Sequence, residues 1–366
     1  MLSILLLYHN TSASAQSIDV SKLDQYFETL ENNNKFLGSV SVFRNGSEIY
    51  TKSVGFTDID RQVAANEKSG YSIGSISKTF TAVMIFQAIE ADKLSLSETI
   101  DRYFPSIGNA KEITIGHLLG HRSGIHNFTA DEQYPNWQTQ HKTKEQMVEI
   151  IARGGNDFEP DSKAQYSNSN YVLLSYILES VYGKSYAEIL VKQVTTPLSL
   201  DNTYFGENSK SNSYKYFDRW RMEQKTNPSI TLGAGGIVST PGDINKFADA
   251  LFSGSLISAN SLSVMRAMKD NYGMGLFPVP FHAKQGYGHS GGVDGFYSML
   301  IYFPEDKISY AITANGLNYL LNDIHIAVLS CVYGMPFDVP NFQAVNLNPE
   351  DLDKYTGEGI NLPFPG

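Results

Sequence analysis

Strand-like segments lie near both ends of this chain, and helix-like segments fill the middle. Residues 37–56 and 295–315 each contain two β-rich runs separated by a turn. Between them, residues 145–155 and 171–183 have the apolar spacing of helices. This order predicts an α+β fold, in which one antiparallel sheet built from both chain ends is flanked by helices.

The same order predicts how the chain is divided. We expect one main domain at residues 16–334, followed at residues 335–366 by a linker and the start of a C-terminal extension. Within the main domain, the sheet part should comprise about residues 16–94 and 231–334. A mainly helical insertion should comprise about residues 95–230.

The first residues have features of a secretory signal. Leu2–Leu7 is a short apolar run, and Ala13–Ala15 is a small-residue cleavage site. The run is too short to span a bilayer, so we expect no transmembrane segment here. Residues 1–15 are therefore predicted to be a signal peptide of a periplasmic or secreted protein. No basic residue precedes the run, and a disordered tail is the alternative.

Composition excludes several function classes. The formal net charge is -10, which disfavours binding to nucleic acid or to anionic lipid. Cys331 is the only cysteine, so no internal disulfide can form. The eight histidines show no metal-binding spacing. We expect no metal and no cofactor, and the expected partner is a small-molecule or peptide substrate.

Ser75 and Lys78 precede the apolar segment TFTAVMIF and form the first candidate site. Residues three apart on a helix share a face, so the hydroxyl and the amine should point the same way. A serine needs a neighbouring base, and burial lowers the pKa of a lysine so that it can serve as one. The spacing predicts a nucleophile with its base, although a serine N-cap beside a solvated lysine has the same pattern.

Two further segments carry compatible side chains. Tyr166 and Asn168 precede an apolar helix-like run. A phenol near a lysine can relay a proton, and an amide can orient both the lysine and a substrate carbonyl. The segment His289–Gly292 stands at the expected start of a strand, where glycines let a substrate approach the backbone. Taken alone, these segments would be an ordinary helix entry and a glycine-rich turn.

Together, the order S-x-x-K, Y-x-N and a box like K-T-G resembles the serine β-lactamase and penicillin-binding-protein superfamily. The phrases ITIGHLLGHRSGI and GAGGIVSTPGDINKF are similar to segments of class C β-lactamases and of their carboxypeptidase, D-aminopeptidase and esterase relatives. The resemblance implies a β-lactamase/transpeptidase-like fold and an acyl-enzyme mechanism. The catalytic residues it implies are Ser75, Lys78 and Tyr166. The substrate-binding and oxyanion residues it implies are Asn168, His289, Ser290, Gly291 and Gly292, with the backbone N–H groups of Ser75 and Gly292 as oxyanion donors.

Two positions depart from the family pattern. His289 stands where these β-lactamases have lysine, and a histidine provides less positive charge at neutral pH. This weakens the expected recognition of a β-lactam carboxylate. Asp161 stands before the Y-x-N box, where relatives usually have glycine, and is expected to reshape that loop. The phrase LNPEDLDKYTGEG resembles the beginning of a C-terminal barrel found in some relatives.

Two other interpretations stay open at this point. Ser290 lies in GHSGG, which matches the nucleophile elbow of α/β-hydrolases, with Asp323 and His325 following in the right order. A strand-like run follows Ser290, however, where an elbow needs a helix. The second alternative is a sensor with the same fold, which binds a β-lactam or peptidoglycan fragment covalently and turns over little.

We therefore expect a serine hydrolase that acts through a Ser-Lys-Tyr acyl-enzyme. Its substrate would be a D-amino-acid peptide, a β-lactam-like amide or a small ester. His289 fits the peptide or ester better than the β-lactam. Tyr166 would activate the water that releases the acyl group, and the pocket should lie between the sheet and the helical region.

Overall fold

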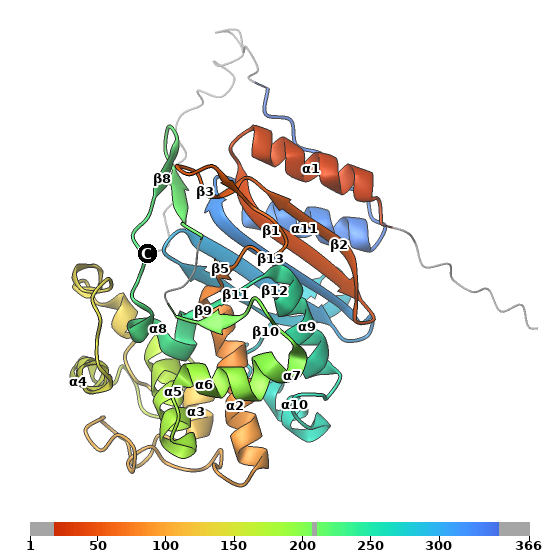
Figure 1. The fold of residues 1–366 in the computed structure, drawn as a ribbon. Helices are drawn as coiled ribbons and strands as arrows, with labels where there is room; N and C mark the ends of the chain where they lie inside the picture. Colours follow the sequence, from red (N-terminus) through yellow and green to blue (C-terminus); the bar gives the residue numbers. More distant parts are fainter. Residues whose placement is uncertain (1–17, 207–210, 344–366) are drawn as a thin grey trace, which may run out of the picture.

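The computed structural model describes residues 18–206 and 211–343, and its centre is an antiparallel sheet (Figure 1). Its main strands are β1 (Phe36–Arg44), β2 (Ser47–Val54), β10 (Phe277–Phe281), β11 (Lys284–Val293), β12 (Phe296–Phe303) and β13 (Ile308–Leu317). They lie in the order β10-β11-β12-β13-β1-β2. β1 lies beside β13, with Val40 opposite Ile312. The two ends of the chain therefore build one sheet, and the predicted α+β class is confirmed.

Short strands extend or flank this sheet. They are β3 (Phe56–Asp58), β4 (Val63–Ala64), β5 (Tyr71–Ser72), β6 (Tyr204–Phe205), β7 (Tyr214–Tyr216), β8 (Trp220–Met222) and β9 (Ile237–Ser239). β7 pairs with β13 and β8, so the β7–β8 hairpin extends the main sheet. β5, β9 and β6 form a separate small sheet.

Local sequence explains the main hairpins. β1 and β2 are joined by Asn45 and Gly46, whose φ angles of +53° and +76° suit a two-residue turn between twisted strands. A second two-residue turn joins β11 to β12, because Val293 lies opposite Phe296. Its residues are Asp294 and Gly295, the Asp-Gly pair that such turns favour.

Helices lie on both faces of the sheet and form the helical region beside it (Figure 1). They are α1 (Val20–Asn32), α2 (Ser77–Glu90), α3 (Ile115–Leu119), α4 (Lys144–Gly154), α5 (Asn168–Tyr182), α6 (Tyr186–Leu190), α7 (Thr196–Leu198), α8 (Pro228–Gly235), α9 (Pro241–Phe252), α10 (Ala259–Met265) and α11 (Leu321–Val332). α1 and α11 enclose one core with side chains such as Val42 and Tyr310 (Figure 1). α9 packs against β1 and β13 and belongs to a second core shared with the helical region.

Helix α2 is the centre of this second core. Every residue from Ser77 to Phe86 is buried, which agrees with a sequence that is apolar on nearly all sides. The ring of Phe80 stacks on that of Phe247 in α9 at a centroid distance of 3.7 Å. α5 and α8 lie against α2 from other directions. The start of α2 is thus held where the sheet and the helical region meet.

The predicted signal peptide, residues 1–15, lies outside the described residues, as do residues 344–366 of the predicted C-terminal segment. The described part of that segment lies against α1, where the rings of Phe337 and Tyr26 are 6.1 Å apart. None of the helices in the described ranges combines the length and the apolar character that crossing a bilayer requires.

Candidate active site

Ser75 lies in a short 3₁₀ turn, η1 (Gly74–Ile76), directly before α2. Gly74 has a φ of +49°, and a Cβ at this position would lie 2.7 Å from the backbone nitrogen of Gly292 on β11. Glycine therefore allows the turn and the strand to approach this closely. The N-terminus of a helix favours negative charge, so the position suits a nucleophile whose reaction develops an oxyanion.

Lys78 lies in the first turn of α2 and is completely buried. Its Nζ is 2.9 Å from Ser75 Oγ, 2.7 Å from Asn168 Oδ1 and 2.6 Å from Ala234 O. Burial lowers the pKa of this lysine well below its usual range. A neutral amine has two N–H donors and one lone pair. It can therefore donate to both carbonyl oxygens and still accept the proton of Ser75.

Tyr166 reaches Ser75 from the loop before α5. Its phenol donates a hydrogen bond of 2.7 Å to Ser75 Oγ. Burial raises the pKa of the phenol above its usual value, so Tyr166 is protonated at neutral pH. Lys78 Nζ lies 4.8 Å from the centre of the Tyr166 ring. The serine oxygen thus lies between an amine that can take a proton and a phenol that can give one.

Asn168 orients the amine of Lys78. It is the first residue of α5, and Asn127 Oδ1 accepts its backbone N–H at 3.0 Å. Its side-chain Nδ2 donates to Thr129 Oγ1 at 2.9 Å. Because Thr129 takes the donor end of the amide, the oxygen end faces Lys78. Neither Asn127 nor Thr129 belongs to a recognised motif, so only the folded chain reveals their part in the site.

The HSGG segment lies at the end of β11, and the expectation that it starts a strand is wrong. β10 pairs with β11 only as far as Gly288, so residues 289–293 have one open edge. The sequence does not predict β10, because this strand contains Pro278 and Pro280. Edge strands tolerate proline, and inner strands do not. The hairpin of β10 and β11 therefore extends β11 before His289.

His289 is buried with 2% of its surface exposed, and burial lowers its pKa to about 3. Its Nδ1 donates to Ser290 O at 2.5 Å, and its ring centre is 4.6 Å from that of Phe277. The imidazole is therefore neutral at physiological pH. The position that holds lysine in the similar β-lactamases supplies no positive charge to a substrate here.

In the rest of the HSGG segment, Gly291 is closely packed, whereas Ser290 and Gly292 are exposed. A Cβ at Gly291 would lie 2.1 Å from Ile73 O, so Gly291 lets β11 close on the residues before η1. Ser290 is exposed, and a Cβ at Gly292 would meet no described atom within 4 Å. Because the turn after Val293 closes with a hydrogen-bonded pair, the N–H of Gly292 points away from β12, toward the open edge beside Ser75.

Ser290 does not form a nucleophile elbow. It lies inside β11, with a strand on either side of the following turn. Asp323 and His325 lie in α11, which belongs to the core on the other face of the sheet. There His325 Nδ1 is 2.8 Å from Tyr310 Oη. The three residues do not come together, so the α/β-hydrolase interpretation is wrong.

His121 is a site residue that the catalytic motifs do not reveal. Its ring centre lies 4.5 Å from that of Tyr166 and 5.2 Å from that of Tyr171. Its Nδ1 accepts the backbone N–H of Ser167 at 3.2 Å. Complete burial keeps its pKa well below the usual value, so the ring is neutral. His121 therefore holds the ring of Tyr166, and the available signal was a histidine within the family phrase GHLLGHRSGI.

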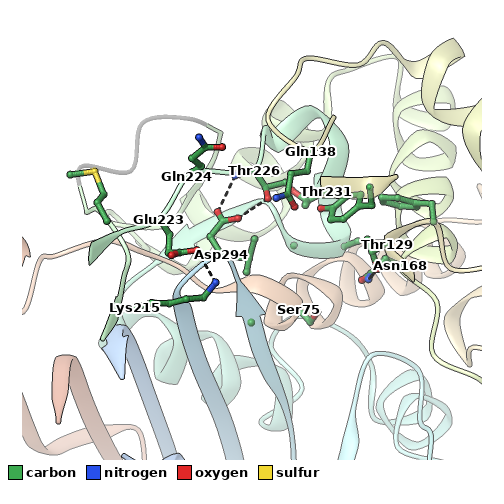
Figure 2. Close-up of a pocket in the computed structure, with 17 residues that line it drawn as sticks. Ser75, Thr129, Gln138, Asn168, Lys215, Glu223, Gln224, Thr226, Thr231 and Asp294 are labelled. Carbon is green, nitrogen blue, oxygen red and sulfur yellow. Dashed lines mark hydrogen bonds and ion pairs between the residues drawn. The ribbon is translucent and has the colours of Figure 1, made fainter. Parts of the chain in front are cut away.

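A pocket of about 560 Å³ opens beside Ser75 (Figure 2). Ser75, Asn168 and Gly292 form part of its wall. The other polar side chains that line it belong to Thr129, Tyr134, Gln138, Lys215, Glu223, Gln224, Thr226, Thr231 and Asp294. No group of three His, Cys, Asp or Glu side chains in the described ranges is placed to hold a metal ion.

The fold and this site define a serine hydrolase. A serine at the N-terminus of a buried helix has a buried amine and a neutral phenol within hydrogen-bond distance of its oxygen. The sequence profile of the family described as Beta-lactamase matches residues 23–326. The chain therefore belongs to the Beta-lactamase family, and the resemblance to serine β-lactamases and penicillin-binding proteins is confirmed.

Several proteins to which this chain is similar are hydrolases by name. Teichoic acid D-alanine hydrolase of Staphylococcus aureus (strain MRSA252) is 26% identical over 322 residues, which cover 83% of this chain and 77% of the relative. A D-stereospecific amidohydrolase from Streptomyces sp. is 26% identical with a TM-score of 0.69, covering 80% of this chain and 94% of that one. D-amino acid amidase from Ochrobactrum anthropi SV3 shares the fold, with a TM-score of 0.76 at 24% identity and coverage of 86% and 99%.

Proposed function

We propose that this protein hydrolyses D-aminoacyl esters or amides through an acyl-enzyme on Ser75. The observation that carries the proposal is the position of Ser75 Oγ between Lys78 Nζ at 2.9 Å and Tyr166 Oη at 2.7 Å. The relatives support the D-aminoacyl part, because a teichoic acid D-alanine hydrolase and a D-stereospecific amidohydrolase are each 26% identical to this chain.

Acylation follows from the protonation states of the two neighbours. The neutral amine of Lys78 takes the proton of Ser75 as Oγ bonds to the substrate carbonyl carbon. When the bond to the leaving nitrogen or oxygen breaks, the phenol of Tyr166 donates its proton to that atom. The resulting phenolate lies beside the new Lys78 ammonium, which is 4.8 Å from its ring centre and stabilises it.

Deacylation restores the starting protonation states of Tyr166, Lys78 and Ser75. The Tyr166 phenolate takes a proton from a water molecule as the water oxygen attacks the acyl carbon. The ammonium of Lys78 gives its proton back to Ser75 Oγ as that oxygen leaves. Each group then regains its starting state, so one water is consumed in each cycle and no external acid or base is required.

The negative charge that develops on the carbonyl oxygen has two proposed donors. These are the backbone N–H groups of Ser75, at the N-terminus of α2, and of Gly292, on the open edge of β11. The close contact of Gly74 with Gly292 brings the two donors to the same side of the pocket. Each such donor contributes about 10²–10³ in rate.

Neutral His289 makes a β-lactam or a peptide with a free terminal carboxylate a poorer substrate. A carboxylate near Ser75 needs a cation, and burial keeps the imidazole uncharged at neutral pH. Among the described residues of the pocket wall the one lysine is Lys215, and it is paired with Glu223 at 2.8 Å. We place the activity in the periplasm or outside the cell, on the strength of the apolar run and small-residue site before Gln16.

The test combines covalent labelling with turnover. A fluorophosphonate adduct is expected on the peptide that contains Ser75, and the mature N-terminus in the same mass maps is expected at Gln16. D-alanine p-nitroanilide should be hydrolysed faster than nitrocefin. Ser75→Ala should lower kcat by about 10⁴–10⁶. Ser97→Ala, at an exposed serine outside the pocket wall, is the matched control and should retain full activity.

Two results would contradict the proposal. One is an adduct on another residue together with activity that survives in Ser75→Ala. The other is stoichiometric labelling by penicillin without turnover of any ester, anilide or β-lactam, which would favour the sensor alternative.

A further inference from the structure

Asp294 stands next to the proposed oxyanion site. It is the first residue of the two-residue turn between β11 and β12 and has a φ of +54°. It follows Gly292 by two positions, which corresponds to about 7 Å along a strand. In the view of Figure 2, Ser75 lies between Asp294 and Asn168 around the pocket. Asp294 and Ser75 therefore face the same pocket.

The carboxylate of Asp294 is held by uncharged donors. Thr226 donates to it twice, from its hydroxyl at 2.7 Å and from its backbone N–H at 3.0 Å. No described lysine or arginine comes within ion-pair distance of Asp294, whereas Glu223 is paired with Lys215 at 2.8 Å. The carboxylate of Asp294 is therefore oriented by neutral donors, while Lys215 and Lys225 act on it only from beyond ion-pair distance, and burial raises its pKa.

The charges around the pocket favour a cationic substrate group. The charged side chains in its wall are Lys215, Glu223 and Asp294, and because Lys215 is paired with Glu223, Asp294 is the member of this wall without an ion pair to a described residue. Lys225 and Asp294 both line an adjoining pocket of about 320 Å³, and the two side chains interact electrostatically there. His289 beside the nucleophile is neutral. An ammonium near Ser75 would meet an opposite charge, and a carboxylate there would meet a like charge.

We propose that Asp294 binds the α-ammonium group of the substrate and so determines which acyl groups Ser75 accepts. This inference rests on the proposed function. With the carbonyl oxygen at the N–H of Gly292, the α-ammonium is two covalent bonds from the carbonyl carbon, and Asp294, two residues beyond Gly292, presents its carboxylate to the same pocket. A hydrogen bond between an ammonium and a partly buried carboxylate is short and strong. Acyl groups without that ammonium should react more slowly.

The experiment compares two esters that differ only at this group. D-alanine methyl ester carries an ammonium where D-lactate methyl ester carries a hydroxyl. At a pH at which the amine is protonated, kcat/KM for the D-alanine ester should exceed that for the D-lactate ester by about 10–100-fold. Asp294→Asn should lower the first value by about the same factor and leave the second within about twofold. Asp218→Asn removes an exposed acid outside the pocket wall and should change neither.

The outcomes separate this inference from the proposed function. If neither ester shows hydrolysis that depends on Ser75, the proposed function is wrong. If both react through Ser75 at equal rates in the natural protein, or if Asp294→Asn keeps the preference, then Asp294 is not the ammonium site although the enzyme class stands. The D-lactate ester reports whether the variant is folded. If Asp294→Asn does not fold, Asp294→Glu keeps the charge and should keep a preference of the same direction.

Discussion

The amine of Lys78 is surrounded by neutral oxygens: a hydroxyl, a side-chain amide and a backbone carbonyl. No described carboxylate forms an ion pair with it, so only burial acts on its pKa and lowers it. The absence of a nearby acid is thus what leaves a lone pair available for the proton of Ser75. This dependence can be tested by placing an acid there.

The variant Asn168→Asp places an acid beside the amine of Lys78. An aspartate oxygen in the place of Asn168 Oδ1, 2.7 Å from Nζ, would stabilise the ammonium and raise the pKa of Lys78 by about 1–3 pH units. The neutral amine would then form only at higher pH. The acid limb of the kcat/KM profile on a neutral ester should move upward by that amount, and the rate at neutral pH should fall.

Thr129→Val is the matched control for this change. It removes the hydrogen bond of 2.9 Å to the other end of the same amide without adding a charge. The rate should fall because the amide is less well held, but the acid limb should stay where it is. An acid limb that does not move in Asn168→Asp would mean that Lys78 is not the group whose ionisation limits the reaction.

At the scale of elements, the site depends on the contact between η1 and β11. A side chain at Gly74 would collide with the backbone of Gly292 on β11. A side chain at Gly291 would collide with the backbone of Ile73, directly before η1. The contact sets the distance between the two proposed oxyanion donors. A small displacement of the turn should therefore affect the transition state more than it affects the stability of the fold.

Gly74→Ala is expected to lower kcat/KM by about 10²–10³, the effect of losing one oxyanion donor. A Cβ here meets Gly292 N at 2.7 Å and also strains a backbone with φ of +49°. Gly183→Ala is the control, because Gly183 has a φ of +61° at the end of α5 but no described atom within 4 Å of a Cβ. Both variants should lose about 1–2 kcal/mol of unfolding free energy from backbone strain.

The measurements are urea unfolding and ester kinetics on both variants. Equal losses of activity in the two proteins would assign the effect to backbone strain in general. Loss confined to Gly74→Ala would assign it to the contact between turn and strand.

The sequence predicts elements well where the signal is local. The hairpin around Asn45 and Gly46 and the buried helix after Ser75 follow from turn chemistry and from apolar spacing. The spacing of Ser75 and Lys78 likewise places both side chains on one face. β10 is not predictable in this way, since Pro278 and Pro280 argue against a strand until β11 is there to pair with it.

The sequence also does not predict the roles of site residues when those roles depend on packing against distant parts of the chain. The charge state of His289 depends on its burial beside Phe277, and the role of His121 depends on where the Tyr166 loop lies. Asp294 gives only a turn signal in the sequence. Its relation to the pocket depends on Thr226, which is distant along the chain. Sequence motifs therefore identify the groups that react. Tertiary contacts identify the residues that position those groups and the residues that select the substrate.

For the whole molecule, Asp161 connects three loops around Tyr166. Its φ of +62° lies in the left-handed region, which glycine adopts readily and aspartate tolerates. Its carboxylate pairs with Arg122 and, at 2.9 Å, with Lys269. Arg122 also pairs with Asp270. The loops are thus joined by charge as well as by packing.

Asp161→Asn should change the pH dependence of stability. The two cations lower the pKa of Asp161 from 3.8 to about 2. The folded protein therefore keeps this carboxylate ionised at a lower pH than the unfolded chain does. The stabilisation is present above about pH 4 and is lost as the pH falls toward 2. At pH 7 it should stay within about 1 kcal/mol, since the side chain is half exposed.

Urea unfolding between pH 2 and pH 7 measures this effect. The natural protein and Asp161→Asn should differ at pH 7 and converge near pH 2. Asp60→Asn removes an exposed acid that forms no ion pair with a described residue, and its difference from the natural protein should show no such convergence. A gap for Asp161→Asn that persists at pH 2 would point to the loop conformation instead of its charge.

The pairing of β1 with β13 also bears on how the protein is made. On the ribosome β1 emerges early, yet one of its edges stays uncovered until β13 has been translated. At typical elongation rates this wait lasts on the order of ten seconds to a minute. Gly292 appears late in the same interval, long after Ser75 and Lys78. A nascent chain would carry its serine and amine without the strand that completes the oxyanion site, and would stay inactive until β11 has been translated and has folded against η1.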